Sequence, residues 1–529
     1  MIIPRVKKET IGAGRIPLGE KIIVSGDEAG FVANFMSEFY PSGEGKGKIT
    51  FVRDENLKSE AYTISAGDDV IVRFSDRLGA RNAAATLVQL LEKDENGFFL
   101  PVCEIEDAPD CGFRSVLIDL ARGIPDIERL KEDIRRLALF KCNYVHLHLM
   151  DSAGTCYVSS VLAFNGQING TDRCDKSYLK EINDYCEALG IEVIPELEIP
   201  SHASGLWQLD PEIRCVTDLP DPSPACVCAG NEHTYTVFSR LVDEVCEIFK
   251  GKYFHVGGDE IMFEDFPDWN YHCHYDVCKT CRDRAEKEGF EPTIQNLYYY
   301  VMRRMHDILA AKGKTMIMWN DEIDVARPVP LPKDIIVQYW TIAAPGRGPW
   351  EGCSYEKLVS SGFRVINSSV KYEYIDKPEY FNPERAGGFV WNKNPDPGED
   401  NKNVIGAETC AWEYGNPKNT HYLTSFTFAT ALLLDREWNV DLAAYGDEYR
   451  RALTRAMFGA ETPKNYDVTE LFGSVAPPRQ NDIVTFASLK NEIFRKGQIA
   501  PIRAKLDEIG CTYSPILLSG IKKLFNEEK

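Results

Sequence analysis

Two adjacent acids, Asp259 and Glu260, form the pattern in this sequence that points most directly to chemistry. They follow the run HVGG at 255–258, whose two glycines let the backbone turn tightly. Neighbouring side chains diverge, so the two carboxyls can address different parts of one ligand. Their like charges favour one proton donor beside one persistent anion. A helix N-terminus capped by two acids would show the same pair, so the residues at the other strand ends decide between the two.

Polar and aromatic side chains also follow seven other short apolar runs. In chain order these are Arg122, Asp151, His202, Trp319, Trp340, the group Tyr372, Tyr374 and Asp376, and finally Trp412 with Glu413. Each alone has an ordinary explanation, such as an ion pair for the arginine or core packing for a tryptophan. Their recurrence after successive runs favours one pocket with polar and aromatic walls. Such a pocket suits a sugar ring, which has apolar faces and a rim of hydroxyl groups.

The runs that precede these residues have the rhythm of a (β/α)8 TIM barrel, an α/β fold. Helical segments are predicted at 126–140, 177–189, 235–249, 293–312 and 355–361. The strands are predicted at 115–120, 144–149, 192–198, 253–257, 315–319, 335–340, 364–369 and 405–411. The fifth and sixth strands are joined by a short connection, so one barrel helix is expected to be reduced. In this fold the chemistry lies at the carboxyl ends of the strands, which is where the polar residues fall.

Three unequal domains are predicted. Residues 1–108 mix short strands with a helix near 80–91 and indicate an α+β accessory domain. Residues 109–438 form the barrel, and residues 439–529 form a helical extension with helices at 442–458 and 482–494.

Composition and charge restrict the function classes. The 529 residues include 60 Lys and Arg against 81 Asp and Glu, a net charge of −21, which argues against a general nucleic-acid or anionic-membrane binder. No apolar run approaches the roughly 18 residues of a transmembrane helix. The first residues lack the apolar core of a signal peptide. We therefore expect a cytoplasmic protein, with a mature secreted form as the alternative.

The 16 cysteines are scattered through apolar runs, which indicates reduced thiols more than a disulfide framework. One cluster stands out, with Cys273, Cys278 and Cys281 beside His272 and His274. The spacing Cys278-x-x-Cys281 is typical of metal ligands, but no second pair lies at finger distance. Free thiols in an insertion are therefore the favoured interpretation and zinc the alternative, and we expect neither a metal nor another cofactor at the candidate pocket.

Several of these runs together resemble glycoside hydrolase family 20, the β-N-acetylhexosaminidases. RSVLIDLAR at 114–122, YVHLHLMD at 144–151 and PELEIPSH at 195–202 resemble the family's first three barrel strands. HVGGDE at 255–260 matches its most specific signature, and RNAAATLVQLL at 81–91 resembles the accessory domain that precedes the barrel.

The resemblance covers about residues 1–435 and implies an exo-acting, retaining enzyme that removes terminal β-linked GlcNAc or GalNAc. The family is substrate-assisted: the 2-acetamido oxygen attacks C1 and forms an oxazolinium-like intermediate. It implies that Glu260 acts first as acid and then as base, and that Asp259 orients the acetamido N–H. Tyr374, with Tyr372 as the alternative, would hold the acetamido oxygen.

The resemblance also implies supporting roles. A relay of Asp151 and His202 would position the acid, and the substrate-binding candidates are Arg122, Trp319, Trp340, Trp412, Asp376 and Glu413. The family usually places a small residue between the strand-eight tryptophan and a hydroxyl-binding glutamate. Here Glu413 follows Trp412 directly, which leaves the gluco/galacto preference open.

Two other functions fit parts of the pattern. His146 and His148, with histidines on other strands, would suit a metal-dependent barrel hydrolase, but strand alternation places both inside the barrel, before its mouth. A non-catalytic carbohydrate-binding barrel would be expected to lack the acid, which is present as Glu260. We therefore expect a small molecule or oligosaccharide with a terminal N-acetylhexosamine as the partner, no nucleic acid or membrane, and a homodimer as the assembly to test.

Overall fold

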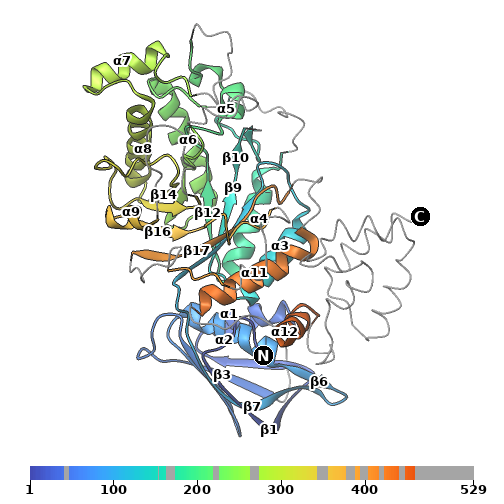
Figure 1. Ribbon diagram of the computed structural model, residues 1–529. Coiled ribbons are helices and arrows are strands. Elements are labelled where there is room, and N and C mark those ends of the chain that lie inside the picture. Colours follow the sequence, from blue (N-terminus) through green and yellow to red (C-terminus); the bar gives the residue numbers. More distant parts are fainter. Residues whose placement is uncertain are drawn as a thin grey trace, which may run out of the picture.

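The computed structural model describes residues 1–40, 47–152, 154–162, 173–217, 226–261, 273–341, 355–376, 388–392, 403–415, 422–439 and 447–458. A helix-covered sheet from the first part of the chain lies at one end of a closed barrel (Figure 1). Among the described residues, no helix combines the length and apolarity needed to cross a membrane.

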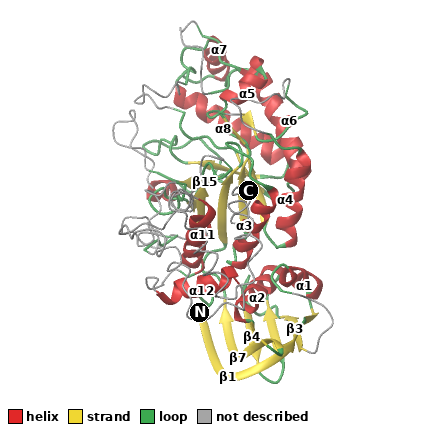
Figure 2. Cartoon of the chain, turned by 90° about the vertical axis from the view of Figure 1, so that its right-hand side faces the viewer, coloured by secondary structure: helices red, strands yellow, loops and turns green. Residues whose placement is uncertain are grey.

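The N-terminal domain is a seven-stranded sheet that carries two helices on one face. Its strands pair in the order β1-β7-β4-β5-β3-β2, with β6 against β7. The alternating burial of β4 and β5 gives the sheet one core face, and Figure 2 shows α1 and α2 between the sheet and the barrel. The elements are β1 (Lys8–Gly19), β2 (Ile22–Gly26), α1 (Ala29–Ser37), β3 (Gly47–Arg53), β4 (Tyr62–Ala66), β5 (Val70–Phe74), α2 (Arg77–Leu90), β6 (Glu92–Asp94) and β7 (Gly97–Asp107).

The predicted TIM barrel is confirmed: eight parallel strands close on one another, and each overlaps a predicted strand. Nearly all their residues are buried, because the barrel core lies on one side and the helices on the other. The strands are β8 (Phe113–Asp119), β9 (Tyr144–His148), β12 (Glu192–Glu196), β13 (Tyr253–His255), β14 (Thr315–Trp319), β15 (Ile336–Tyr339), β16 (Arg364–Asn367) and β17 (Val404–Ala411).

Three of the helices that follow the strands, α3, α6 and α8, begin at a side-chain cap. The side chain of Asp126, for example, accepts backbone N–H groups at the start of α3. As the short connection predicts, residues 320–335, all of them described, contain no helix. The barrel helices are α3 (Ile127–Leu139), α4 (Lys176–Ala188), α6 (Glu232–Ile248), α8 (Ile294–Ala311), α9 (Tyr355–Ser360) and α11 (Tyr422–Trp438).

Short elements lie in the loops that follow the carboxyl ends of the second to fourth strands, where the candidate site lies. They are β10 (Met150–Asp151), β11 (Gly154–Thr155), α5 (Ser204–Leu209), the 3-10 turn η1 (Pro211–Ile213) and α7 (Lys279–Glu288). At the other end of the chain, α12 (Asp447–Phe458) falls within the helix predicted at 442–458. The helix predicted at 482–494 lies outside the described residues.

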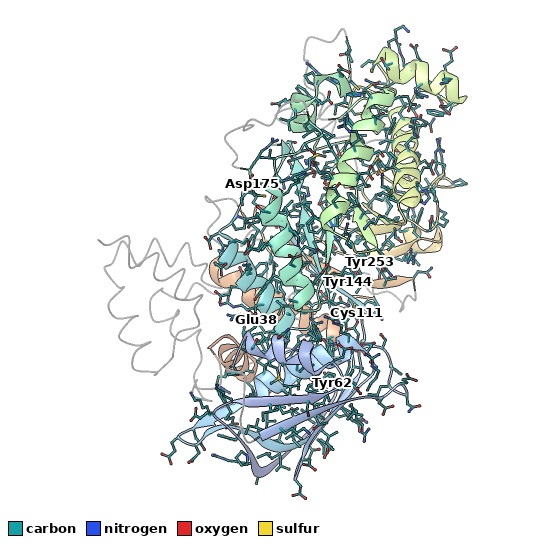
Figure 3. All side chains as sticks on the ribbon, turned by 180° about the vertical axis from the view of Figure 1, so that it is seen from behind. Glu38, Tyr62, Cys111, Tyr144, Asp175 and Tyr253 are labelled. Atoms are coloured by element: carbon teal, nitrogen blue, oxygen red, sulfur yellow. The ribbon has the colours of Figure 1, made fainter. Side chains whose placement is uncertain are left out.

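Buried ion pairs join the N-terminal domain to the base of the barrel. The Nζ of Lys141 lies 2.8 Å from the carboxylate of Asp107, which also accepts the hydroxyl of Tyr62 at 2.6 Å. Tyr62 is labelled in the N-terminal domain in Figure 3. Arg114 on β8 pairs in the same way with Glu60. Removing one partner would leave an unpaired buried charge, so these pairs hold the two domains in one arrangement.

Candidate functional site

A glycine turn at the end of β13 aims the two adjacent acids out of the barrel. Gly257 has a φ of +66°, and a Cβ at this position would lie 1.5 Å from Oε2 of Glu198. Only glycine fits there, because any side chain would collide with that buried carboxyl. The hydroxyl of Tyr298 donates to the carbonyl of Gly258 at 2.9 Å and fixes the next peptide. Asp259 therefore leaves the strand on a rigid support.

Glu260 sits on a strained and firmly held backbone. Its φ is 55°, and its N–H donates to Oδ2 of Asp321 at 2.9 Å. The following N–H, of Ile261, donates to Oε1 of Glu322 at 2.8 Å. The Glu260 side chain stays 21% exposed, so its carboxyl is accessible to a ligand.

Left-handed backbone recurs among the candidate residues. His202 has a φ of 48° and Glu413 a φ of 57°, so with Glu260 they make three of the six non-glycine residues that show a positive φ in the described chain. Such conformations cost free energy and persist where the surrounding structure imposes them, commonly at functional sites.

His202 connects the acid to a buried charge relay. Its Nε2 lies 3.2 Å from Oε2 of Glu260, and its Nδ1 lies 3.4 Å from Oδ2 of Asp151. Asp151 in turn lies 2.6 Å from the guanidinium of Arg122. Burial opposes ionisation of this carboxyl, but Arg122 and His202 hold the pKa of Asp151 well below its usual range.

The imidazole of His202 responds to these neighbours. Burial disfavours the charged ring, yet the Asp151 carboxylate and the contacts with Asp151 and Glu260 raise the pKa of His202 well above its ordinary value. A cationic His202 thus places positive charge 3.2 Å from the carboxyl of Glu260.

Asp259 offers a buried oxygen that lacks a partner. Its side chain is 13% exposed, and its Oδ1 has no hydrogen-bond partner in the part of the chain that the structure describes. Burial raises the pKa of Asp259 well above its usual range. His202 opposes that rise, and the carboxylates of Asp321 and Glu260 add to it. A ligand N–H would satisfy this oxygen and stabilise its charge.

Three aromatic side chains line one side of these acids. The ring of Tyr374 stacks on Trp340 with centroids 6.0 Å apart, and it lies 6.3 Å from Trp412. The neighbouring candidate, Tyr372, packs instead against Phe389 at 5.5 Å. Of the two tyrosines, Tyr374 is therefore the one that lies in the aromatic cluster of the site.

Trp319 lies deeper than a wall position, whereas Arg122 stays partly exposed. Trp319 is 1% exposed and donates its indole N–H to Glu196 at 3.1 Å, so it forms the floor. Arg122 stays 28% exposed although it pairs with Asp151 and with Asp119, and it lies 5.5 Å above the ring of Trp412. It can therefore support the relay and still reach a ligand.

The last two candidates follow the seventh and eighth strands. Asp376 is buried, and Glu413 is partly exposed with its N–H donated to Oδ2 of Asp119 at 2.9 Å. That contact ties the carboxyl end of β17 to the carboxyl end of β8 and fixes the direction in which the Glu413 side chain leaves the backbone.

Sequence reasoning gave no role to Asp321. Its Oδ1 accepts the indole N–H of Trp340 at 2.9 Å, while its Oδ2 holds the backbone of Glu260. Burial raises the pKa of Asp321 to about 6, although these hydrogen bonds oppose the rise. The run WNDE at 319–322 was the available signal, because it places acids directly after a strand.

A second network that sequence reasoning missed lies below the floor. Oε1 of Glu196 lies 2.7 Å from Nδ1 of His255, Oε2 lies 3.3 Å from Nε2 of His146, and the same carboxyl also contacts His148. Burial disfavours a charged ring, but Glu408 and Glu196 raise the pKa of His146 to about 10. The histidines that suggested a metal-dependent hydrolase thus each have a carboxylate partner inside the barrel.

Comparisons with known proteins place the chain in a family. The model of the glycosyl hydrolase family 20 catalytic domain matches residues 112–428, and the model of domain 2 of that family matches residues 1–108. The beta-hexosaminidase of Emericella nidulans is 28% identical over 397 residues, 66% of this chain and 59% of that protein. The alpha subunit of the Bos taurus beta-hexosaminidase is 26% identical over 372 residues, 68% of this chain and 67% of that protein.

Solved structures give the same result. The crystal structure of the beta-N-acetylhexosaminidase from Bacteroides fragilis is 26% identical, has a TM-score of 0.72, and covers 86% of this chain and 94% of its own. The chain spans about three fifths of the length of the first curated relatives it matches. Because the catalytic-domain model alone accounts for more than half of its residues, this chain belongs to glycosyl hydrolase family 20.

Proposed function

We propose that this protein is an exo-acting, retaining β-N-acetylhexosaminidase that removes terminal β-linked GlcNAc or GalNAc with the help of the substrate's own acetamido group. One observation carries the proposal: a nitrogen of His202 and one oxygen each of Asp259 and Glu260 lie within 4.8 Å of one another beside the aromatic cluster. A proton donor, an anion and an apolar wall are what a sugar with an acetamido substituent requires at one point.

Glu260 is the proposed acid and base. Its exposed carboxyl protonates the glycosidic oxygen as the bond to C1 breaks, and it then takes a proton from the water that opens the intermediate. His202 and Asp151 are positioning residues in this scheme. His202 holds the carboxyl through the 3.2 Å contact, and Asp151 holds His202 from the buried side.

Asp259 and Tyr374 are proposed to orient the nucleophile, which belongs to the substrate. The unpartnered Oδ1 of Asp259 accepts the acetamido N–H and offsets the positive charge that develops on the oxazolinium ring. Tyr374 donates its hydroxyl to the acetamido oxygen from the side of Trp340 and Trp412. The aromatic rings exclude water from the methyl group.

The remaining contacts bind the sugar ring. Arg122, partly exposed beside Trp412, is placed to donate to hydroxyl groups on the far side of the ring from the leaving group. Glu413 and Asp376 are the proposed hydroxyl acceptors. Trp319 supports the ring position from the floor.

A substrate series tests the proposed activity directly. We expect measurable turnover of an aryl N-acetyl-β-glucosaminide or its galacto epimer, and no turnover of the aryl β-glucoside that lacks the acetamido group. The reason is that the enzyme supplies no nucleophile of its own. Initial rates of aryl release on the three compounds give the answer. Comparable turnover of the plain glucoside would refute the substrate-assisted mechanism.

The two neighbouring tyrosines offer a matched pair of variants. Tyr374→Phe is expected to lower kcat/KM by about 10- to 100-fold, because it removes a hydrogen bond to an atom that becomes the nucleophile. Tyr372→Phe should stay within about twofold of wild type, because Tyr372 packs away from the site against Phe389. Steady-state kinetics on the N-acetylated substrate compare the two. The assignment of Tyr374 fails if the two variants lose activity equally.

We further propose that the protein works in a reducing compartment such as the cytoplasm. The described cysteines form no disulfide with one another, and nearly all of them are buried. Disulfides are rare where thiols are kept reduced, whereas exported proteins commonly form them. Alkylation of intact cells before lysis, followed by mass spectrometry, should find these cysteines unpaired.

A further inference from the structure

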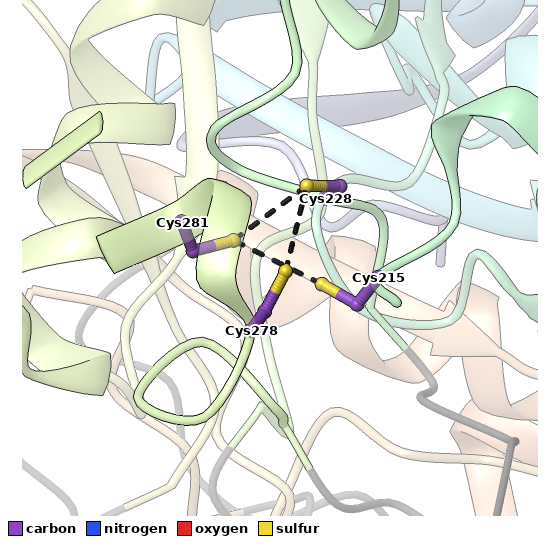
Figure 4. Close-up of side chains that lie close together, drawn as sticks. All are labelled: Cys215, Cys228, Cys278 and Cys281. Carbon is purple, nitrogen blue, oxygen red and sulfur yellow. Dashed lines mark hydrogen bonds between the residues drawn. The ribbon is translucent and has the colours of Figure 1, made fainter. Parts of the chain in front are cut away.

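Four cysteines from two separate segments of the chain meet in one buried cluster. Cys215 follows η1 and Cys228 precedes α6, while Cys278 and Cys281 flank the first residues of α7 (Figure 4). Their four sulfur atoms all lie within 4.8 Å of one another, and all four side chains are buried. The pair Cys278-x-x-Cys281 therefore has the partners that its spacing alone did not reveal.

The separations of the sulfur atoms match metal coordination. The Sγ of Cys281 lies 3.6 Å from that of Cys228 and 3.9 Å from that of Cys215, and Cys228 lies 4.0 Å from Cys278. In tetrahedral zinc thiolates the Zn–S bond is about 2.3 Å, so two sulfurs lie about 3.8 Å apart. A disulfide would bring two sulfurs to about 2.05 Å.

From this geometry we propose that Cys215, Cys228, Cys278 and Cys281 bind one structural Zn²⁺ ion. Four thiolates fill a tetrahedral shell and leave no open position, which is the form of a structural rather than a catalytic zinc site. Four soft sulfur ligands also select zinc over hard cations such as Mg²⁺ or Ca²⁺.

The backbone around the cluster is built to bring the two segments together. An isolated antiparallel bridge between Arg214 and Val227 holds the two stretches of chain that carry Cys215 and Cys228 side by side. On the facing side, a Cβ on Gly230 would lie 2.1 Å from the carbonyl oxygen of Thr280, so the two backbones touch where only glycine fits.

The N-terminus of α7 adds a favourable field. Cys278 is the residue that precedes the helix, and Cys281 lies in its first turn. The positive end of a helix dipole stabilises thiolates there. Arg284, one turn further along, donates from its guanidinium to the carbonyl of Gly230 at 3.3 Å and ties the helix to the other segment.

The position of the site gives the ion a role. Cys215 and Cys228 follow β12 and the loop of His202, whereas Cys278 and Cys281 follow β13 and the loop of Glu260. One ion would thus join two chain segments, one that follows His202 and one that follows Glu260. The bound zinc holds the insertion at 273–288 in place and takes no part in the chemical step.

Metal analysis of the purified native protein tests this inference without reference to activity. We expect about one zinc ion per chain by inductively coupled plasma mass spectrometry. Replacement of zinc by Co²⁺ should give the visible and thiolate-to-metal absorption of a tetrahedral four-sulfur site. Both measurements use the wild-type chain, so they decide the question even if a cysteine variant does not fold.

Matched variants identify the ligands. Cys278→Ser is expected to lose most of the zinc and the cobalt spectrum, while Cys273→Ser, which removes a buried thiol from the same segment, should keep both. Several results would overturn the proposal: a wild-type chain that neither contains zinc nor takes up cobalt, bound iron in place of zinc, a disulfide among the four cysteines, or full zinc content in Cys278→Ser.

Discussion

Glu260→Gln is expected to lower kcat/KM by about 10²-fold or more on a substrate with a poor leaving group such as an N-acetylglucosamine disaccharide. Glutamine has the same shape and can keep the contact with His202, but it cannot deliver a proton to the departing oxygen. On an aryl substrate whose leaving group departs without protonation, the first step should be affected much less. The ratio of the two losses is therefore the informative measurement.

A second readout separates this chemical role from a structural one. Because Glu260 also activates water in the second step, an anionic nucleophile such as azide should partly restore turnover of the activated substrate by Glu260→Gln and leave the wild-type rate nearly unchanged. Circular dichroism and the thermal midpoint should match those of the wild type. Equal wild-type and variant rates on the disaccharide would rule out Glu260 as the acid.

The barrel could be predicted because its strands are buried on both faces and read as short continuous apolar runs. The polar residue after each run marks the strand end, which is why the set from Arg122 to Glu413 was found. Strand ends were less accurate. The fourth strand ends at His255 rather than at 257, because Gly257 already adopts a left-handed φ and leaves the sheet.

Contacts between loops could not be predicted from local pattern. Asp321 acts on Glu260 through a backbone N–H that belongs to another strand's loop, and nothing in its own segment indicates that partner. Trp319 was expected in a wall, but its indole N–H reaches down to Glu196, and this direction depends on the barrel's interior.

The cysteine cluster illustrates the same limit. Cys278 and Cys281 have a recognisable spacing, yet Cys228 lies 50 residues before Cys278 and Cys215 lies 66 residues before Cys281. A strand and a helix of the barrel separate the two segments, and the barrel's parallel topology returns the chain to the same rim. Motif spacing captures neighbours along the chain but misses ligands that only the fold brings together.

Asp259→Asn is expected to reduce kcat by about 10²- to 10³-fold on N-acetylated substrates. Asparagine still offers an oxygen to the acetamido N–H, but it lacks the negative charge that offsets the oxazolinium-like intermediate. The loss should therefore appear mainly in kcat and less in KM. Wild-type kcat in this variant would contradict the assigned role.

Asp321→Asn supplies the matched control, since Asp321 is a neighbouring buried acid that faces the backbone of Glu260 and the indole of Trp340. Asp259 must be ionised to stabilise positive charge, so activity should fall as the pH drops through its pKa. The charge on Asp321 raises that pKa. Its neutralisation should lower the pKa of Asp259 and move the acid limb of the kcat/KM profile to lower pH. The loss of kcat at neutral pH should be smaller than in Asp259→Asn, although an amide oxygen can accept only one of the two N–H groups, of Glu260 and Trp340, that Asp321 accepts. If the acid limb of the kcat/KM profile stays in place or moves to higher pH, a group other than Asp259 controls it. Protonation of Asp259 would then not be the cause of the activity lost at low pH.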